Sequence, residues 1–541
     1  MTHGRSSNIL FIMCDQLRHD YLGCYGHPAL KTPHIDSLAE RGMRFDRAYV
    51  QSPVCGPSRM STYTGRYPRS HGTTWNSFPL RVGEMGMGDH LRPLGVRTAL
   101  CGKTHMVADR KGMERLGIAP SSPEGRLMAE CGFELWDRLD GLHQRASGKQ
   151  PTHYQARMQA RGYRTDNPWE DYANAPLGDH GEALSPWHLS QAHRPARAAE
   201  RDTETAYSTD RAIEFMEDAG DRPWCLHLSY IKPHWPYVAP APYHRMYGAR
   251  DVIPVVRSDM ELRDPHPILR EFHRNRVSQV FSRPEVRDRV IPVYMGLIKQ
   301  IDDNIGRLLD YLRKSGQAQR TMIVFTSDHG DYLGDHWLGE KDMFHDCAVR
   351  VPLIVMDPSP AADATRGTVS DALVECIDLL PTFIEYYGGT VPTQIIEGKS
   401  LIGLLHRSRA KLREVAISEY DYSVRKARVG LEMPVADCRM QMVFDGRFKL
   451  VNVVGFRPML FDLAEDPDEL RDLGADPACR EVIVRLTRAL LDWALRHHCR
   501  VTVSDADLQD AIGGEARAGI YLGCWDQGDI DQIIRSGDSG Y

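Results

Sequence analysis

Short apolar runs recur along the first two thirds of the chain and alternate with longer stretches of mixed polar and apolar residues. Five runs have the length and apolar content of buried strands: residues 8–13, 96–101, 224–229, 321–327 and 351–356. Strongly apolar strands separated by helices are typical of a parallel sheet covered on both faces. The pattern therefore predicts an α/β fold with a large, mostly parallel central sheet sandwiched by helices.

The clearest helix is predicted over residues 294–314, where apolar side chains follow the i, i+3, i+4, i+7 spacing. These positions are Tyr294, Leu297, Ile298, Ile301, Ile305, Leu308, Leu309 and Leu312. Gly316 suits the end of this helix, because glycine adopts a left-handed backbone without strain. Two other stretches, residues 121–199 and 239–290, have little regular pattern. Each is interpreted either as a wall of an active site or as a plain surface excursion.

The pattern changes after about residue 405. Alternating positions over residues 414–420, 438–444 and 448–453 predict an antiparallel sheet, with Asp445-Gly446 as a hairpin turn. Residues 481–498 have the spacing of a helix.

We therefore expect a catalytic domain over residues 1–405 and a smaller α+β subdomain over residues 406–541. The tail from residue 511 is expected to pack on a partner subunit or on the main body, through Tyr521, Trp525, Ile530 and Ile534.

Composition limits the classes of function. A content of 42% hydrophobic and 26% charged residues indicates an ordinary globular protein. The net charge of −6 provides no basic surface for nucleic acid or an anionic membrane. No apolar run is long enough to span a bilayer, and no signal-peptide cleavage region is evident. The twelve cysteines are scattered without a CxxC pair, which suits reduced thiols, so we expect a cytoplasmic protein.

The segment Cys55-Gly56-Pro57-Ser58-Arg59 combines a nucleophile with a helix start. Pro57 suits the first turn of a helix, which places Cys55 at or just before the N-cap. Free N–H groups and the helix dipole favour negative charge there, and Arg59 one turn later can bind an oxyanion. The alternative interpretation is a buried structural cysteine before a proline-initiated helix.

This Cys-x-Pro-Ser-Arg motif resembles the signature of the sulfatase family of the alkaline phosphatase superfamily. The resemblance implies that a separate maturation enzyme oxidises Cys55 to formylglycine, whose hydrate is the nucleophile. Asp15-Gln16 and Asp328-His329, each directly after a predicted strand, resemble the family's metal-binding pairs. The implied ligands are Asp15, Gln16, residue 55, Asp328 and His329. Oxygen ligands favour Ca²⁺ and the imidazole makes Mn²⁺ a competitor, while Gln16 replaces a more usual second aspartate.

Three further segments resemble family motifs around the reacting group. They are Gly102-Lys103-Thr104-His105, Pro233-His234-Trp235-Pro236 and the lysine at position 341. The resemblance implies that Lys103, His105 and Arg59 surround the nucleophile, that His234 faces the leaving group, and that Lys341 holds substrate oxygens. It also implies substrate contacts from Asn76 and Thr104.

The implied reaction is arylsulfatase-like hydrolysis of a small anionic sulfate monoester. A diol oxygen at residue 55 attacks sulfur, and His234 or Lys341 protonates the leaving oxygen. His105 is the candidate base for the collapse that expels sulfate. Relatives with an extended C-terminus suggest a homo-oligomer, either a dimer or a tetramer.

Two alternatives remain open. A phosphonate monoester or phosphodiester hydrolase of the same superfamily is favoured by Gln16, His329, the missing signal peptide and the long tail, whereas Lys103 and His105 favour a sulfatase. A non-catalytic metal-binding relative is disfavoured, because Cys55 and both metal aspartates are retained.

Overall fold

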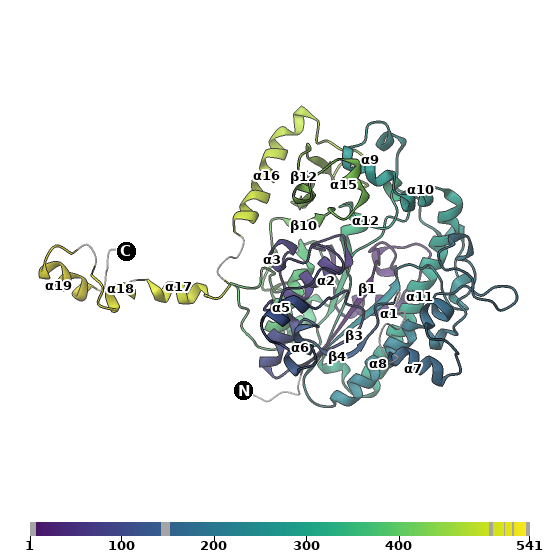
Figure 1. Ribbon diagram of the computed structural model, residues 1–541, viewed down its shortest axis with the longest axis horizontal. Coiled ribbons are helices and arrows are strands. Elements are labelled where there is room, and N and C mark those ends of the chain that lie inside the picture. Colours follow the sequence, from purple (N-terminus) through teal and green to yellow (C-terminus); the bar gives the residue numbers. More distant parts are fainter. Residues whose placement is uncertain (1–6, 142–151, 497–500, 513, 522–523, 537–541) are drawn as a thin grey trace.

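A computed structural model describes residues 7–141, 152–496, 501–512, 514–521 and 524–536. Its centre is a nine-stranded mixed sheet in the order β4-β3-β5-β1-β6-β7-β2-β8, with β9 also beside β2 (Figure 1). The strands are β1 (Asn8–Asp15), β2 (Met43–Tyr49), β3 (Arg97–Gly102), β4 (Glu134–Arg138), β5 (Trp224–Pro233), β6 (Thr321–Ser327), β7 (Arg350–Met356), β8 (Thr368–Ser370) and β9 (Val374–Glu375).

The predicted mostly parallel sheet is confirmed, with one reversal. Strands β4, β3, β5, β1 and β6 are parallel neighbours, whereas β7 is antiparallel to both β6 and β2. A parallel return to the sheet needs a crossover, usually a helix. The connection from β6 to β7 contains only two single-turn helices, η10 (Asp335–Trp337) and α12 (Asp346–Val349), so β7 runs back beside β6.

Helices cover both faces of the sheet, as predicted. Alternate residues of β1 point to opposite sides, so Phe11 and Ile12 belong to different apolar cores. One face is covered by α2 (Cys55–Thr64), α4 (Met87–Leu91) and α13 (Leu379–Tyr386), and the other by α1 (Pro33–Arg41), α8 (Glu204–Ala219) and α11 (Pro284–Lys314). Because β1, β3, β5 and β6 are parallel, their carboxyl ends lie together at one edge of the sheet.

The long helix α11 begins ten residues before the predicted start at residue 294. Its first turns carry Pro292 and several charged residues, so they lack the apolar periodicity by which the sequence was interpreted. The predicted end is confirmed, because Gly316 follows the helix with a φ of 70°.

The smaller C-terminal sheet is also confirmed. It contains β10 (Ala416–Asp421), β11 (Arg439–Phe444), β12 (Phe448–Val453) and β13 (Met459–Asp462), all antiparallel, and α16 (Arg480–Leu495) packs on one face. The β11–β12 hairpin turns at Gly446, whose φ is 97°. Strand β13 was not predicted, since four residues are too few for a visible alternation. The boundary between residues 405 and 406 stays a prediction.

The two stretches without pattern contain short elements that the sequence did not predict. Residues 121–199 include α6 (Pro123–Met128), strand β4 and α7 (His153–Ala160). Residues 239–290 include α9 (Pro267–His273) and α10 (Arg276–Phe281). Strand β4 lies at the sheet edge and is mostly half-exposed, so it lacks the apolar run of an inner strand.

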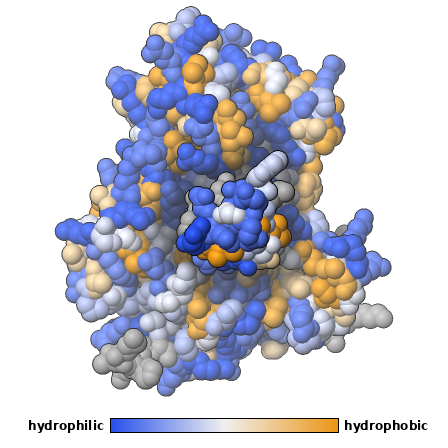
Figure 2. Space-filling view, turned by 90° about the vertical axis from the view of Figure 1, so that its left-hand side faces the viewer, coloured by the Kyte–Doolittle hydropathy of each residue, from blue (hydrophilic) through white to orange (hydrophobic). Residues whose placement is uncertain are grey.

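The C-terminal tail leaves the body of the molecule, as Figure 1 shows, through α17 (Asp505–Ala511), α18 (Gly514–Arg517) and α19 (Gln527–Ser536). Figure 2 looks at the molecule from the side on which the tail projects toward the viewer. Trp525 is 93% exposed and Ile534 is 62% exposed. Trp525 and Ile534 therefore do not pack closely on the main body, and packing of the tail on a partner subunit stays a prediction. Among the described helices, none is long and apolar enough to cross a membrane.

Candidate active site

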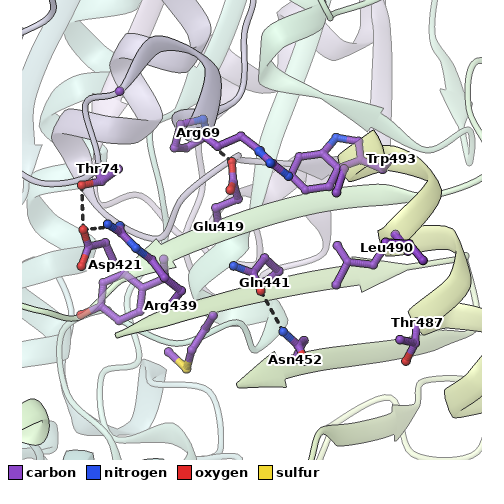
Figure 3. A pocket seen from close by; sticks show the side chains of 16 residues that line it. Arg69, Thr74, Glu419, Asp421, Arg439, Gln441, Asn452, Thr487, Leu490 and Trp493 are labelled. Atoms are coloured by element: carbon purple, nitrogen blue, oxygen red, sulfur yellow. Dashed lines mark hydrogen bonds and ion pairs between the residues drawn. The ribbon is translucent and has the colours of Figure 1, made fainter. Parts of the chain in front are cut away.

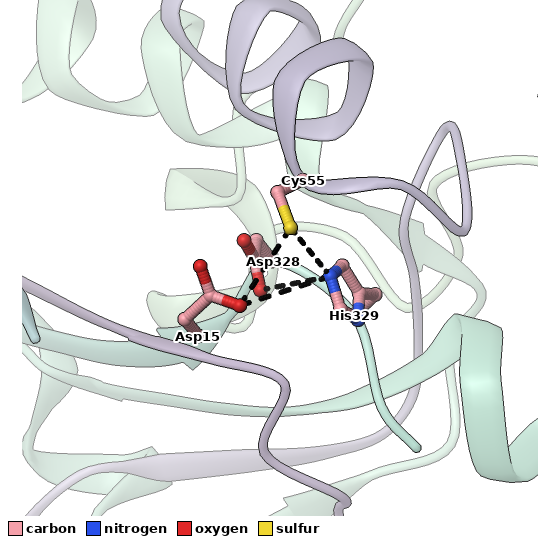
Figure 4. Close-up of side chains that lie close together, drawn as sticks. All are labelled: Asp15, Cys55, Asp328 and His329. Atoms are coloured by element: carbon pink, nitrogen blue, oxygen red, sulfur yellow. Dashed lines mark hydrogen bonds and ion pairs between the residues drawn. The ribbon is translucent and has the colours of Figure 1, made fainter. Parts of the chain in front are cut away.

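Cys55 lies at the first position of α2, after the extended residue Val54. Its side chain is fully buried, and its Sγ lies 3.0 Å from His329 Nε2 and 3.7 Å from Asp15 Oδ1 (Figure 4). Lys341 Nζ lies 3.2 Å from the same sulfur. Three side chains from separate parts of the chain therefore converge on the sulfur atom of Cys55.

The surroundings of Cys55 favour negative charge at this position. Burial raises the pKa of the thiol, but the nearby charges of Lys341 and His329 outweigh burial and hold that pKa well below its ordinary value. The helix N-terminus acts in the same direction. An anionic oxygen at residue 55 would be stabilised by the same groups.

Two buried carboxylates sit beside the sulfur because β1 and β6 are parallel neighbours. Cys14 pairs with Ser327 in the ladder, so Asp15 and Asp328 leave the two strands side by side. Arg59 donates from Nε to Asp328 Oδ2 at 2.8 Å and from its second amino group to Asp15 Oδ2 at 3.2 Å. Lys103 Nζ lies 2.5 Å from the same Asp15 oxygen.

Arg59 has no nitrogen left over for a ligand in this arrangement. Its remaining amino group donates to the Lys103 carbonyl at 2.9 Å and to Ser229 Oγ at 2.7 Å. The guanidinium therefore orients the carboxylates, and the predicted direct contact of Arg59 with an oxyanion stays a prediction.

The donor atoms suit a divalent cation. Asp15, Cys55, Asp328 and His329 each offer one ligand atom, and these atoms lie within 4.8 Å of one another. The Oδ2 atoms of both carboxylates are bound by Arg59, whereas their Oδ1 atoms lie 3.8 Å and 3.7 Å from His329 Nε2. Two carboxylates and an imidazole, all fully buried, form a set that hard or borderline cations prefer.

The tautomer of His329 fits the same use. Its Nδ1 lies 2.8 Å from the Gly330 carbonyl oxygen, which can only accept, so Nδ1 carries the proton. The lone pair of the neutral ring is then on Nε2, facing the carboxylates. Without a cation, Asp328 and the Cys55 thiolate overcome burial and raise the pKa of His329 to about 9.

Gln16 lies beside this cluster with its side chain turned toward other partners. Its Nε2 donates to Asp331 Oδ2 at 2.5 Å, and its Oε1 lies 3.5 Å from Lys341 Nζ. Its backbone N–H donates to Asp328 Oδ1 at 3.0 Å. The structure thus brings Gln16 to the site, while its role as a ligand stays a prediction.

Asp331 was missed by the sequence analysis. This buried carboxylate accepts from Gln16, from the Tyr237 hydroxyl at 2.8 Å and from the Leu333 N–H at 3.0 Å. In the sequence, Asp331 is visible only as a further polar residue after β6, three positions past Asp328.

A second acidic cluster, formed by His34, Asp302 and Asp303, is already neutralised. Lys299 pairs with both carboxylates, and Asp302 also accepts from the N–H groups of His34 and Ile35. This cluster needs no cation.

The loop after β3 carries three predicted residues. Lys103 reaches Asp15, whereas the backbone N–H groups of Thr104 and His105 donate to Asp140 Oδ1 at 3.1 Å and 3.3 Å. His105 has a left-handed backbone with a φ of 54°, and its buried Nδ1 has no partner among the described residues. Thr104 Oγ1 accepts from the Met106 N–H at 3.1 Å, so its predicted contact with substrate stays a prediction. Asp140, which shapes this loop, was not found from the sequence.

His234 follows β5 and approaches Asp15 Oδ1 to 3.9 Å through Nε2. Its Nδ1 lies 2.6 Å from the Trp235 carbonyl oxygen, so Nδ1 carries the ring proton and Nε2 is an acceptor. Burial and the Lys103 charge lower the pKa of His234 to about 4. His234 is therefore neutral near pH 7 and holds no proton on the atom that faces the site.

Lys341 is the charged donor beside the sulfur. Burial disfavours its charge, but Cys55 and Glu340 raise its pKa above the ordinary value. It lies between Glu340 and Asp342, whose φ angles are 67° and 102°. Asp342 accepts from the Tyr420 hydroxyl at 2.9 Å and from Arg425 at 2.7 Å, so the C-terminal subdomain holds the lysine loop.

Asn76 lies at the N-terminus of α2. Its Oδ1 accepts from the Gly56 N–H at 2.7 Å, one residue after Cys55. The structure therefore brings Asn76 close to the nucleophile position, where a contact with substrate stays a prediction.

A cavity of about 600 Å³ between α16 and the C-terminal sheet contains none of the predicted site residues (Figure 3). Its polar side chains satisfy one another: Thr74 donates to Asp421 at 2.8 Å and Asn452 donates to Gln441 at 2.9 Å. This cavity is separate from the Cys55 cluster.

Comparison with known proteins identifies the relatives of this chain. The model of the sulfatase family matches residues 7–389, and that of the C-terminal region of N-sulphoglucosamine sulphohydrolase matches residues 334–496. A multifunctional alkaline phosphatase superfamily protein, PehA, from Trinickia caryophylli is 30% identical over 91% of this chain and 95% of its own. An arylsulfatase from Clostridium perfringens is 27% identical over 90% and 93%. Among solved structures, a phosphonate monoester hydrolase from Silicibacter pomeroyi has a TM-score of 0.79 and 29% identity over 92% and 97%.

Proposed function

The chain belongs to the sulfatase family of the alkaline phosphatase superfamily, and from this premise we propose that it is a sulfuric ester hydrolase whose nucleophile is generated at Cys55. The observation that carries the proposal is the convergence on Cys55 Sγ of His329, Lys341 and Asp15, all within 3.7 Å. A structural cysteine in an apolar core would not need this set of charged neighbours.

In the proposed mechanism, a maturation enzyme first converts the Cys55 thiol to the formylglycine aldehyde, and water adds to give a diol. One diol oxygen attacks the sulfur of the ester while the bond to the alcohol oxygen breaks. Lys341 donates a proton to that departing oxygen, since it is charged and lies 3.2 Å from the sulfur atom that marks the nucleophile. His234 has its proton on the opposite nitrogen and acts as an acceptor.

Release of sulfate needs no second attack at sulfur. A base removes the proton of the remaining hydroxyl, the carbonyl forms again, and the bond between Cβ and the sulfate oxygen breaks. His105, whose Nδ1 has no protein partner among the described residues, is the proposed base. Addition of another water restores the diol, so each turnover consumes one water.

Asp15, Asp328, His329 and residue 55 would hold the divalent cation, with Gln16 as the proposed fifth ligand. Such a cation acts as a Lewis acid on ester oxygens and lowers the pKa of a coordinated hydroxyl. Calcium and manganese are the two proposed ions. Lys103 and Arg59 keep the carboxylates oriented through their outer oxygens.

The second candidate function is hydrolysis of phosphonate monoesters or phosphodiesters by the same residues. Its support is the likeness to the phosphonate monoester hydrolase from Silicibacter pomeroyi, with a TM-score of 0.79. Sulfuryl and phosphoryl groups place similar charge on their nonbridging oxygens, so one site can accept both. In either case we propose a cytoplasmic homo-oligomer that acts on small anionic esters.

The deciding experiment compares kcat/KM for 4-nitrophenyl sulfate and 4-nitrophenyl phenylphosphonate, using protein whose intact mass proves conversion of Cys55. A higher value for the sulfate, abolished in Cys55→Ala, supports the sulfatase. A clear preference for the phosphonate supports the second candidate function, hydrolysis of phosphonate monoesters or phosphodiesters. Activity on both esters that survives in Cys55→Ala contradicts the nucleophile for either one.

Removal of the cation provides an independent test. Dialysis against a chelator should abolish turnover, and addition of Ca²⁺ or Mn²⁺ should restore it, since two buried carboxylates then regain their counter-charge. Thermal unfolding should shift upward on addition of the ion that binds. Asp328→Asn should lose that shift, and unchanged turnover after complete chelation would contradict the metal site.

A further inference from the structure

A cavity of about 730 Å³ adjoins the candidate active site and has no role in the mechanism above. Two of its lining residues, Trp235 and Glu340, are the chain neighbours of His234 and Lys341. We call it the aromatic cavity, because its walls include Trp187, Trp235, Tyr237 and Phe281. It lies between the two stretches that the sequence analysis left without a pattern.

Trp235 and Glu340 form the wall shared by the cavity and the site. The Trp235 indole N–H donates to Glu340 Oε1 at 3.0 Å, which holds the two side chains together. The Trp235 and His234 rings have centroids 4.3 Å apart, and Glu340 Oε1 lies 3.6 Å from Lys341 Nζ. A group bonded to the oxygen beside Lys341 thus meets this wall first.

The apolar surface of the cavity suits a flat ring. Trp187 and Trp235 have ring centroids 5.8 Å apart and planes at 61°. Trp187 is nevertheless 49% exposed. Aromatic side chains gain most when a second ring covers such a surface.

Three arginines line the cavity and favour an anionic group in it. Arg283 pairs with Glu285 at 2.6 Å, and Arg289 donates to the Ser190 carbonyl at 3.0 Å. Arg276, at the start of α10, has no hydrogen bond or ion pair within the part of the chain that the structure describes. Its guanidinium is available for a carboxylate or another planar anion.

We propose that the aromatic cavity binds the alcohol part of the ester and selects aromatic groups that carry an anionic substituent, with Arg276 as the specificity-determining residue. The inference rests on the proposed function, because it assumes that the bridging oxygen lies beside Lys341. Glu340 repels an anion and Arg276 attracts one, so the anionic substituent of the ring is expected to face Arg276.

The test measures kcat/KM for phenyl sulfate and 4-carboxyphenyl sulfate in the wild type, Arg276→Gln and Trp187→Ala. The ratio of the two substrates is compared between proteins, which cancels their different intrinsic reactivity. Arg276→Gln should lower the preference for the carboxylated ester about tenfold. Trp187→Ala should raise KM for both aryl esters about fivefold and leave an alkyl sulfate unchanged. Arg274→Gln, an exposed arginine that does not line the cavity, is the matched control.

Binding to the Cys55→Ala variant separates failure of this inference from failure of the proposed function. Calorimetry with 4-hydroxybenzoate should show binding that is lost when Arg276→Gln is added. Binding that depends on Arg276, without turnover of any sulfate ester, would support the aromatic cavity as a binding site and contradict the proposed sulfatase function. Turnover with unchanged substrate ratios in both cavity variants would overturn the inference and leave the proposed function intact.

Discussion

At the scale of single residues, the backbone carbonyls next to the two histidines beside Cys55 determine which ring nitrogen carries the proton. In His234 and His329 alike, Nδ1 faces a carbonyl oxygen and Nε2 faces the site. The neutral ring of His234 therefore presents a lone pair to the site, and His329 does so only when a cation takes the place of its second proton. Lys341 remains as a permanent cation beside the nucleophile position. From the sequence, His234 and Lys341 are equal candidates for the proton donor, because a tautomer depends on backbone geometry that no motif contains.

Lys341→Gln should lower kcat about 100-fold or more, and the loss should be larger for phenyl sulfate than for 4-nitrophenyl sulfate. The poorer leaving group depends more on a proton, so the comparison reports on the donor itself. His234→Asn serves as the reference variant and should lower both rates by the same factor. A larger loss on phenyl sulfate in His234→Asn than in Lys341→Gln would contradict the assignment.

A buried histidine near α2 should make the stability of the fold depend on pH. Burial and the charges of Arg66 and Arg81 lower the pKa of His71 to about 3, from an ordinary value of 6.5. Between these values the unfolded chain binds a proton that the folded chain does not, so the free energy of unfolding falls as pH falls. The full contribution, on the order of 5 kcal/mol, is present above pH 6.5 and is lost by pH 3.

Urea unfolding at pH 7 and pH 5 checks this prediction. The wild type should lose about 2 kcal/mol more than His71→Gln over that interval, because glutamine does not titrate. The difference between the two proteins cancels the other buried histidines. Equal losses in both proteins would show that His71 is not the titrating group.

At the scale of elements, the inner strands could be predicted and the edges could not. Strands β1 and β6 are apolar along almost their whole length, so the sequence located them and the polar residues at their ends. Strand β2 mixes buried and half-exposed positions and includes Arg44, Asp46 and Arg47, which hide its pattern. The site residues that depend on strand ends were therefore found, whereas Asp140 and Asp342, which act through tertiary hydrogen bonds, were not.

Gly102 is the glycine on which the end of β3 depends. Its φ is 113°, and a Cβ added there would lie 2.0 Å from the Ser229 carbonyl oxygen on the adjacent strand β5. Gly102→Ala should lower the free energy of unfolding by about 3 kcal/mol and displace Lys103 from Asp15.

Gly95→Ala is the matched control for this prediction, since Gly95 has a φ of 78° but no neighbour within 4 Å. It should cost about 1 kcal/mol, which isolates the backbone strain from the steric clash. Chemical denaturation measures both variants. Equal effects would show that the strands move apart without penalty.

At the scale of the whole molecule, charge is divided unevenly between the body and the tail. Residues 501–541 contain eight acidic and two basic side chains, so this segment alone accounts for the net charge of −6. Its apolar residues include Trp525, which is 93% exposed, and Ile534, which is 62% exposed. An exposed apolar surface of this kind is typical of an interface between subunits. The sequence identified the apolar positions of the tail but not its direction.

A chain that lacks residues 501–541 should therefore form a smaller assembly than the full chain, as measured by light scattering after size-exclusion chromatography. Its kcat per site should change less than twofold, because the helices α17, α18 and α19 lie away from the body that carries the candidate site. Trp525→Ser in the full chain should weaken the same assembly. An identical mass per particle for full and shortened chains would contradict a subunit interface in the tail.

The complete burial of α2 has a consequence for the biosynthesis of the protein. All ten residues of this helix are buried, and it packs against η12 (Cys376–Asp378) and α13, which lie more than 300 residues later in the chain. If Cys55 is converted as proposed, the maturation enzyme would reach its side chain only before that later segment has been made and has folded over it. At about 5–20 residues per second, translation leaves the cysteine uncovered for some tens of seconds. The supply of the maturation enzyme during translation, rather than after folding, would then set the fraction of active molecules in a cell.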